Sequence, residues 1–338
     1  KLRRQIMIAT TSVGPGATNM VTAAGVAHSN RLPILLLSGD TYNNRLPDPV
    51  LQQVEHFGEP STTVNDSFRS VSRYWDRITH PAQILSSLPQ AVATMMDPAD
   101  CGPAFIGLPQ DVQEIAYDYP VEFFTETTWR MTRTRPDLQQ VDEAVKILKM
   151  AKKPLIISGG GVRYSGAVEA LVKFAEQRMI PVAETIAGKG AFVHDHPFYV
   201  GAIGIEGTDA AKELAESADV VIAVGTRLQD FTTGSWTTFR YDAKFININA
   251  ARFDARKHFS NPIVGDALEC INELNSRMED WVCDASRMDE ARKLYSDWNE
   301  AIDKGQAPTN ASFPSYAQVI AVVNKHAKPE DTMVTAAG

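Results

Sequence analysis

Two glycines flanking a proline near the start of the chain form the first segment with the composition of a ligand-binding loop. Gly14 and Gly16 permit backbone angles that other residues resist, and Pro15 stiffens the turn between them. When such a loop leads into a helix, amide N–H groups stay free to face the polar or anionic atoms of a ligand. A strand-to-helix turn without a ligand has the same spacing, so both interpretations stay open at this point.

Two later segments could contact a nucleotide or a phosphate. A triple glycine at 159–161 follows an apolar run and could surround a pyrophosphate, although it does not fit the pattern G-x-G-x-x-G and a tight turn needs the same residues. Arg227 follows a second apolar run and, together with Thr226, could hold a phosphate or a sugar. Pairing of Arg227 with Asp230 at a loop is the alternative.

Histidines and aromatic residues give weaker signals. His194 and His196 stand two residues apart in a polar loop, but a third metal ligand is missing, so a solvated turn is favoured. Tyr74 and Trp75 could grip a substrate ring, although packing at a helix or strand edge is the commoner role. No Ser-His-Asp or Cys-His set can be assigned from the sequence.

The composition excludes several classes of partner. The 338 residues carry a net charge of -8 and no extended basic run, which argues against nucleic-acid binding. The hydrophobic fraction of 44% suits a globular protein of two or three domains, and no apolar stretch reaches the length needed to span a membrane. Cys101, Cys270 and Cys283 lack metal-site spacing, so we expect reduced thiols and a cytoplasmic location.

Short apolar runs alternate with helical patterns along most of the chain. This alternation predicts an α/β fold with doubly wound, mostly parallel sheets and helices on both faces. The expected strands are 6–9, 33–38, 103–108, 153–158, 181–184, 218–225, 243–249 and 331–338. The expected helices are 19–28 with Asn19 as its capping residue, 81–96, 137–151, one ending at 177, 209–218, 284–304 and 315–326. Neither terminal segment can bury its own apolar face, so both ends of the chain look cut.

Five sequence blocks lie in order along most of the chain: TSVGPGATN at 11–19, LLLSGD at 35–40, GPAFIGLPQD at 102–111, KPLIISGGG at 153–161 and GKGAF at 188–192. Together they resemble the acetolactate-synthase-like thiamine-diphosphate enzymes. Three further stretches are RLPDPVLQQ at 45–53, VSRYWDRI at 71–78 and QDVQEIAYD at 110–118. These resemble the trihydroxycyclohexane-1,2-dione hydrolase family, whose members open a ring in myo-inositol catabolism.

The resemblance implies an architecture of three domains. The expected segments are a pyrimidine-binding domain lacking its N-terminal part at 1–125, a linker at 126–136, a complete Rossmann-like central domain at 137–282, a linker and helix at 283–311, and the start of a diphosphate-binding domain at 312–338. The family's glutamate that bonds the aminopyrimidine would lie before Lys1, and its magnesium and diphosphate motif after Gly338. We therefore expect a fragment without a metal site of its own that is inactive alone.

The resemblance also implies the ligands of the complete enzyme. These are thiamine diphosphate, which serves as an electron sink, Mg²⁺ and a small cyclic dione substrate, in a homo-oligomer that is at least a dimer. The residues that would shape the pyrimidine pocket are Gly14, Pro15, Gly16 and Asn19. Gln52 or Gln53 would approach the substrate or the partner subunit.

Two other functions are compatible with the residues. An acetolactate-synthase-like carboligase would carry a flavin in the central domain, although FAD is not expected here. Its candidate contacts would be Gly159, Gly160, Gly161, the loop at 204–207, Arg227 and Asn247. The central domain could also be a nucleotide-binding module without chemistry.

Overall fold

The computed structural model describes residues 5–44, 52–54, 56–328, 330–332 and 334. The chain divides into two compact units, Lys1–Thr134 (unit 1) and Arg135–Gly338 (unit 2). The division falls inside the segment 126–136 that the sequence suggests as a linker. Each unit is built on its own sheet, and every strand pairing in both sheets is parallel, which confirms the predicted fold class.

Unit 1 contains a four-stranded sheet with the order β1-β2-β4-β3. Its strands are β1 (Met7–Thr11), β2 (Ile34–Asp40), β3 (Tyr74–Arg77) and β4 (Pro103–Pro109). Because all four run in one direction, their last residues meet at one border of the sheet, which we call the carboxyl edge of unit 1. The register places Asp40 opposite Pro109 at this edge.

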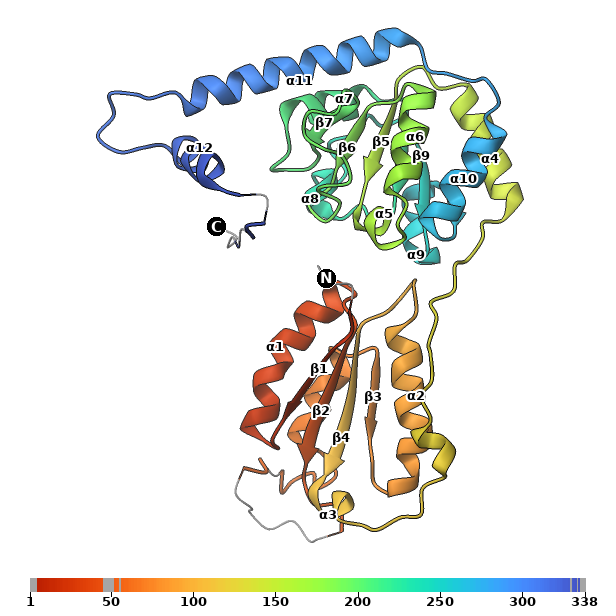
Figure 1. The fold of residues 1–338 in the computed structure, drawn as a ribbon, viewed down its shortest axis with the longest axis vertical. Helices are drawn as coiled ribbons and strands as arrows, with labels where there is room; N and C mark the ends of the chain where they lie inside the picture. Colours follow the sequence, from red (N-terminus) through yellow and green to blue (C-terminus); the bar gives the residue numbers. More distant parts are fainter. Residues whose placement is uncertain (1–4, 45–51, 55, 329, 333, 335–338) are drawn as a thin grey trace. The chain divides into compact units, whose positions relative to one another are not determined.

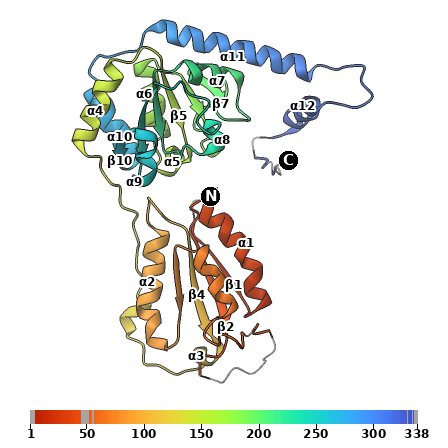
Figure 2. The same ribbon diagram turned by 180° about the vertical axis from the view of Figure 1, so that it is seen from behind.

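Helices cover both faces of this sheet, as Figures 1 and 2 show for α1 and α2. On one face, Phe68 stacks on Phe105 with ring centroids 4.3 Å apart, beside Met20. On the other face, Ile106 packs with Met95. The helices of unit 1 are α1 (Pro15–Ser29), η1 (Val64–Ser70), η2 (Pro81–Gln83), α2 (Ile84–Met95), α3 (Gln110–Gln113) and η3 (Val121–Phe124).

The start of α1 differs from the sequence prediction. The helix begins at Pro15, and Gly14 is its N-cap with φ 71°. The prediction that Asn19 caps the helix is therefore wrong, since Asn19 lies inside α1 with an exposed side chain. The physical reason is that the fixed φ of proline suits the first helical position, whereas the left-handed cap conformation suits glycine.

Unit 2 contains a six-stranded sheet with the order β10-β9-β8-β5-β6-β7. Its strands are β5 (Pro154–Ser158), β6 (Val182–Glu184), β7 (Tyr199–Ala202), β8 (Val220–Val224), β9 (Lys244–Asn249) and β10 (Asn261–Val264). The chain leaves β5 toward β6 on one side and later returns to β8 on the other side. The switch point of this doubly wound sheet therefore lies between the carboxyl ends of β5 and β8.

One continuous core fills unit 2 on both faces of its sheet. Figure 1 shows α6 and the long α11 of this unit. The helices of unit 2 are α4 (Leu138–Lys149), α5 (Gly160–Tyr164), α6 (Val168–Arg178), α7 (Asp209–Ser217), α8 (Asp230–Thr233), α9 (Arg252–Ala255), η4 (Lys257–Phe259), α10 (Ala267–Arg277), α11 (Ala285–Gln306) and α12 (Tyr316–His326).

Apolar side chains stay exposed toward both ends of the chain. In β1, Met7 is 61% and Ile8 66% exposed, and α12 has no buried residue. The expected strand at 331–338 falls mostly outside the described residues. Within the part of the chain that the structure describes, no helix combines the length and apolar character that crossing a membrane requires.

Candidate functional site

The first glycine loop and the segment at Gln52 meet at the carboxyl edge of unit 1. The Ser12 hydroxyl donates to Gln52 Oε1 over 3.3 Å. A Cβ atom at Gly14 would overlap the carbonyl oxygen of Gln52, so only glycine allows this approach. The structure thus brings two of the sequence-predicted site segments together, although 40 residues separate Ser12 from Gln52.

The first turn of α1 opens onto the same edge. No side chain caps the helix, and Pro15 has no N–H to satisfy. The backbone N–H of Thr18 donates to the Gly14 carbonyl over 3.1 Å and closes the first turn. Gly16 lies in this turn, where an added Cβ atom would be 3.4 Å from the Ser12 side chain and 3.6 Å from that of Thr11. A helix terminus of this kind favours polar or negatively polarised ligand atoms.

Gln53 forms a pair of side-chain amides with Gln110, the first residue of α3. Gln53 is 1% exposed, and its Nε2 donates to Gln110 Oε1 over 3.1 Å. Gln53 Oε1 is buried without a hydrogen-bond partner among the described residues. Sequence reasoning missed Gln110. Its position directly after a buried strand, inside the block GPAFIGLPQD, is the signal that could have identified it.

A half-buried arginine ties the ends of β2 and β3 to η1 and its N-cap. Arg77 Nε donates to Asp40 Oδ2 over 2.7 Å, and the Asp40 side chain is fully buried. Arg77 Nη2 donates to Asp66 Oδ2 and to Thr63 Oγ1, each over 2.7 Å. These hydrogen bonds connect β2, β3 and η1 at the carboxyl edge of unit 1.

Hydrogen bonds within this cluster keep Asp66 and Arg77 ionised. Burial acts to raise the pKa of Asp66, but hydrogen bonds from the Thr63 amide, Arg69 and Arg77 outweigh it and lower the pKa to about 2. Burial acts to lower the pKa of Arg77, and its bonds to Asp40 and Asp66 outweigh that effect, so its pKa is raised. Both partners are thus charged at neutral pH.

Trp75 serves packing, as the commoner interpretation of this aromatic pair predicts. The Arg69 guanidinium carbon lies 3.5 Å from the centroid of the Trp75 ring, and Nε1 of Trp75 donates to the Asn65 carbonyl over 3.0 Å. Asn65 is buried, and its Nδ2 donates to the Gly39 carbonyl over 2.9 Å. Asn65 Oδ1 has no partner among the described residues, and neither does Thr11 Oγ1.

These features fit one side of a planar heteroaromatic ring that carries donors and acceptors. The Gly14 loop is held against the Gln52 backbone, and the uncapped turn of α1 offers amide donors. Unpaired oxygens of Thr11, Gln53 and Asn65 supply hydrogen-bond acceptors at the same edge of the sheet. An aminopyrimidine has the matching groups.

The triple glycine of unit 2 serves mainly to pack two backbone segments together. Gly159 N–H donates to the Val224 carbonyl over 2.8 Å, and Gly161 N–H donates to the Gly225 carbonyl over 2.9 Å. A Cβ atom at Gly161 would lie 2.7 Å from the Cα of Gly225. Two of the three amides are therefore already bonded to the end of β8 and the residue after it, and the Gly160 amide forms no such bond.

Arg227 and Asn247 lie at or near the carboxyl ends of β8 and β9. The side chain of Arg227 donates to Gln229 Oε1 over 3.4 Å, and its carbonyl accepts a bond from Lys257. Both amide atoms of the buried Asn247 lack a hydrogen-bond partner among the described residues. The structure thus places an unpaired amide in β9, opposite Ala223 of β8.

The block GKGAF encloses a buried carboxylate. Glu184 accepts hydrogen bonds from the backbone N–H groups of Gly190, Ala191 and Phe192 over 2.8 to 3.0 Å. Burial, followed by the charge of Glu184, raises the pKa of Tyr199 to about 12. These contacts give the block GKGAF a structural role, so its composition needs no ligand to explain it.

The two histidines have different surroundings, because His194 is exposed and His196 is half-buried. His196 Nε2 lies 3.3 Å from Glu176 Oε1, and its Nδ1 accepts the N–H of Phe198 over 3.2 Å. Across the residues described, no group of three or more His, Cys, Asp or Glu side chains is arranged to hold a metal ion.

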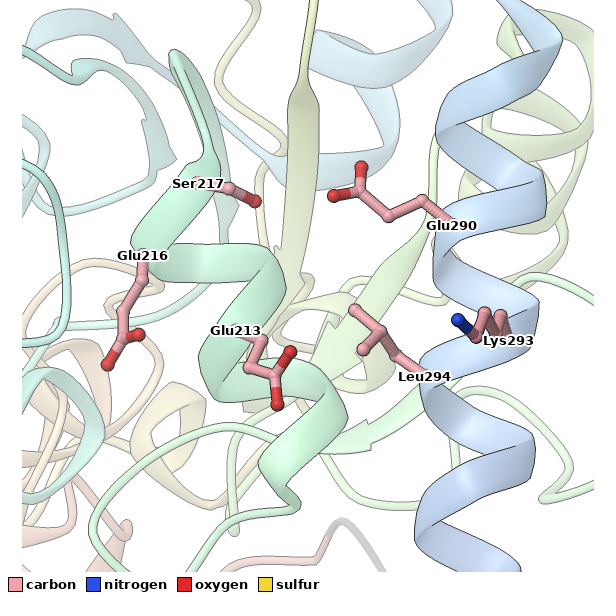
Figure 3. Close-up of a pocket in the computed structure, with 6 residues that line it drawn as sticks. All are labelled: Glu213, Glu216, Ser217, Glu290, Lys293 and Leu294. Carbon is pink, nitrogen blue, oxygen red and sulfur yellow. The ribbon is translucent and has the colours of Figure 1, made fainter.

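An open pocket of about 440 Å³ lies between α7 and α11 (Figure 3). Two of its polar lining residues already have partners within the protein. Arg287 Nη1 donates to Ser217 Oγ over 3.1 Å and to Glu290 Oε2 over 2.9 Å. This groove is therefore the seam where α11 is anchored to the unit 2 core. The lining residues are Glu213, Glu216, Ser217, Glu290, Lys293 and Leu294.

Comparison with known proteins relates the chain to thiamine-dependent enzymes. Residues 141–274 match the family described as "Thiamine pyrophosphate enzyme, central domain". A 3D-(3,5/4)-trihydroxycyclohexane-1,2-dione hydrolase of Geobacillus thermodenitrificans (strain NG80-2) is 46% identical over 304 residues, which are 90% of this chain and 47% of that protein. A protein of the same name from Clostridium perfringens (strain 13 / Type A) is 46% identical over 303 residues, or 89% of this chain and 47% of its own length.

A third relative has the same activity in its name. The 3D-(3,5/4)-trihydroxycyclohexane-1,2-dione hydrolase of Clostridium tetani (strain Massachusetts / E88) is 44% identical over 303 residues, which are 89% of this chain and 47% of that protein. The chain thus spans about half the length of the curated relatives it matches. The segment 141–274 is therefore similar to the central domain of thiamine pyrophosphate enzymes.

Proposed function

We propose that this chain is part of a thiamine-diphosphate-dependent enzyme that hydrolyses a carbon–carbon bond of trihydroxycyclohexane-1,2-dione in myo-inositol catabolism. The observation that carries the proposal is the 46% identity to hydrolases of that name over 90% of the chain. The similar segment is long enough to include both the carboxyl edge of unit 1 and the central-domain match. In the reaction, the bond between the two carbonyl carbons breaks, water supplies OH to one carbon and H to the other, and the ring opens to an acid.

The carboxyl edge of unit 1 is the proposed binding site for the aminopyrimidine side of the cofactor. Gly14 lets the Gln52 carbonyl pack against the loop, Pro15 and Gly16 set the uncapped first turn of α1, and Asn19 lies one turn further along the helix. The unpaired oxygens of Thr11 and Asn65 would accept hydrogen bonds there. The bound cofactor supplies the electron sink for cleavage of the carbon–carbon bond.

Rigid support is the second contribution of this chain's own residues. Arg77 fixes the ends of β2 and β3 through Asp40 and keeps the η1 loop in place through Asp66. A site that is held in this way binds its ligand without a large ordering cost. Gln53 would contact the substrate, with Gln52 supporting the Gly14 loop through its backbone.

The proposal extends to the complete enzyme. Unit 1 would be the pyrimidine-binding domain, residues 137–282 the central domain, and residues 312–338 the start of the diphosphate-binding domain. Mg²⁺ would accompany the diphosphate, and the enzyme would be a cytoplasmic homo-oligomer of at least two subunits. The bonded amides of Gly159 and Gly161 favour a central domain without flavin.

The test compares this chain with a polypeptide of the same gene that has the length of the relatives. With thiamine diphosphate and Mg²⁺, the longer polypeptide should release one acid group for each dione consumed, measured by pH-stat titration. The 338-residue chain, as the control, should show no turnover. Acetolactate formation from pyruvate by the longer polypeptide, or dione hydrolysis by this chain alone, would contradict the proposal.

A further inference from the structure

The pair of Gln53 and Gln110 leaves two polar groups without a described protein partner at the carboxyl edge of unit 1. Their one mutual hydrogen bond uses Nε2 of Gln53 and Oε1 of Gln110. It leaves an acceptor, the buried Oε1 of Gln53, without a partner among the described residues. Gln110 is exposed, and no other described residue bonds its Nε2 donor. Reversing both amides would leave one donor and one acceptor in the same two places, so this complementarity does not depend on how the amides are oriented.

A buried unpaired amide oxygen weakens a fold unless a ligand compensates it. Gln53 is held at 1% exposure within a segment that packs on Gly14, so its side chain cannot turn out to solvent without disturbing that packing. We propose that the Gln53–Gln110 pair determines specificity by binding an adjacent hydroxyl and carbonyl of an uncharged ring. The ligand hydroxyl would donate to Gln53, and the ligand carbonyl would accept from Gln110.

The charges of the edge support an uncharged ligand. A 2-oxo acid needs a cation for its carboxylate. Two described guanidinium groups lie in this cluster. Arg77 already bonds Asp40 and Asp66 with two of its nitrogens, and Arg69 bonds Asp66. The nearby Asp111 carboxylate accepts the backbone N–H groups of Asn43 and Asn44 over 2.9 and 2.7 Å. These charged side chains are therefore bonded within the protein, and the groups left without a partner in this described part of the edge are neutral amide and hydroxyl groups.

This inference rests on the proposed function, because it assigns the substrate class of the same site. The test uses the 338-residue chain and ligand-observed NMR titration with three probes. They are 2-hydroxycyclohexanone, which has an adjacent hydroxyl and carbonyl, cyclohexanone, which lacks the hydroxyl, and pyruvate. We expect 2-hydroxycyclohexanone to bind roughly tenfold more tightly than cyclohexanone, the effect of one lost hydrogen bond to a buried group, and pyruvate not to bind.

Variants of Gln53 and Gln110 test whether these two residues cause the preference for 2-hydroxycyclohexanone. Gln53→Met keeps the side-chain volume and should abolish the preference for 2-hydroxycyclohexanone over cyclohexanone. Gln110→Lys adds a cation and should gain pyruvate binding while it loses the preference. Gln113→Met is the matched control, because Gln113 lies on the same short helix and bonds the Leu108 carbonyl instead. It should leave all three affinities unchanged.

Each outcome bears on the inference. Equal affinities of the unmodified chain for 2-hydroxycyclohexanone and cyclohexanone, binding of pyruvate, or no binding of 2-hydroxycyclohexanone would overturn it, and these comparisons need no variant to fold. The proposed function is judged separately by dione hydrolysis in the longer polypeptide. A preference for 2-hydroxycyclohexanone without hydrolysis would reject the activity alone, whereas hydrolysis without the preference would reject the role of the pair alone.

Discussion

Arg77 donates a 2.7 Å hydrogen bond from Nε to the carboxylate of Asp40, whose side chain is completely buried. The two residues end β2 and β3, which lie on either side of β4 in the unit 1 sheet, and they are 37 residues apart in the chain. A buried carboxylate is costly unless a cation and hydrogen bonds compensate it. This ion pair therefore makes the geometry of the carboxyl edge depend on one arginine.

Replacing Arg77 by methionine should destabilise unit 1 by about 3–5 kcal/mol, because the Asp40 carboxylate would stay buried without its partner. Urea denaturation followed by Trp75 fluorescence measures the change, since Trp75 lies against this cluster. The double variant with Asp40→Asn should recover part of the loss. Arg240→Met is the control, because Arg240 forms its 2.6 Å pair with Asp242 at the surface and should show no measurable effect. Equal effects of the two single variants would show that burial of Asp40 does not matter.

The Asp66 carboxylate should make stability depend on pH in the acid range. Its pKa of about 2 in the folded protein is below the value of about 3.9 for an unfolded chain. Its contribution is therefore complete above about pH 5 and is lost as the pH falls through the folded value. Urea midpoints between about pH 5 and pH 2 should fall less steeply for Asp66→Asn than for the unmodified chain. The exposed Asp118→Asn serves as the control, and identical pH profiles of all three proteins would refute the assignment.

Gly14→Ala should destabilise unit 1 through two separate effects. The φ of 71° is strained for alanine, which costs about 1 kcal/mol, and the added Cβ would overlap the Gln52 carbonyl. Gly166→Ala separates the two, because Gly166 has φ 69° but no atom within 4 Å of an added Cβ. We expect the Gly14 variant to lose at least about 1 kcal/mol more than the Gly166 variant in denaturant titrations. A similar loss in both would mean that the 52–54 segment moves freely away from the loop.

Strand predictions from the sequence succeeded where both faces of a strand are buried. β5, β8 and β9 lie inside the unit 2 sheet, and their continuous apolar runs identify them within two residues. The missed strands β3, β7 and β10 are all at the border of a sheet. A border strand has one neighbour and fewer buried side chains, so sequences such as YWDR or NPIV carry no clear apolar pattern.

The site was only partly predictable for a different reason. Local composition identified the Gly14 loop, because glycine and proline act on their own backbone. The contact of Gln53 with Gln110 joins residues 57 positions apart, and the bond of Arg77 to Asp40 joins residues 37 apart. Such pairs depend on strand order and register, which single-residue patterns do not encode. At Gly161, local composition was misleading. The triple glycine suggested a phosphate loop, but Gly161 packs against Gly225.

Gly161→Ala should therefore reduce stability even without any ligand. The added Cβ would lie 2.7 Å from the Gly225 Cα and 3.0 Å from its carbonyl oxygen, so two backbone segments would have to separate. We expect a loss of about 1–3 kcal/mol for unit 2 in thermal or urea unfolding. Gly305→Ala in α11 is the control, because its nearest neighbour is 4.0 Å away and alanine favours helix. Unchanged stability of the Gly161 variant would instead support a free loop that is kept for ligand binding.

Glu184→Gln tests whether the block GKGAF is held by a charge. The carboxylate accepts three backbone N–H groups, whereas an amide presents one oxygen and would turn its NH₂ group toward a donor. We expect a loss of about 1–3 kcal/mol in the unfolding free energy of unit 2. The same change should lower the pKa of Tyr199 from about 12, because the negative charge is removed while burial remains.

The pKa of Tyr199 is measurable by ultraviolet titration of tyrosinate, with Tyr199→Phe identifying its contribution to the curve. Tyr295 packs edge-on against Tyr199 with ring centroids 5.7 Å apart, so Tyr295→Phe controls for titration of the neighbour. A tyrosine with a folded pKa above its unfolded value keeps its proton to higher pH when native, so its stabilising effect is lost only as the pH rises through the folded value. If Glu184→Gln leaves the pKa of Tyr199 unchanged, burial alone sets that pKa. The block GKGAF would then be held without the charge of the Glu184 carboxylate.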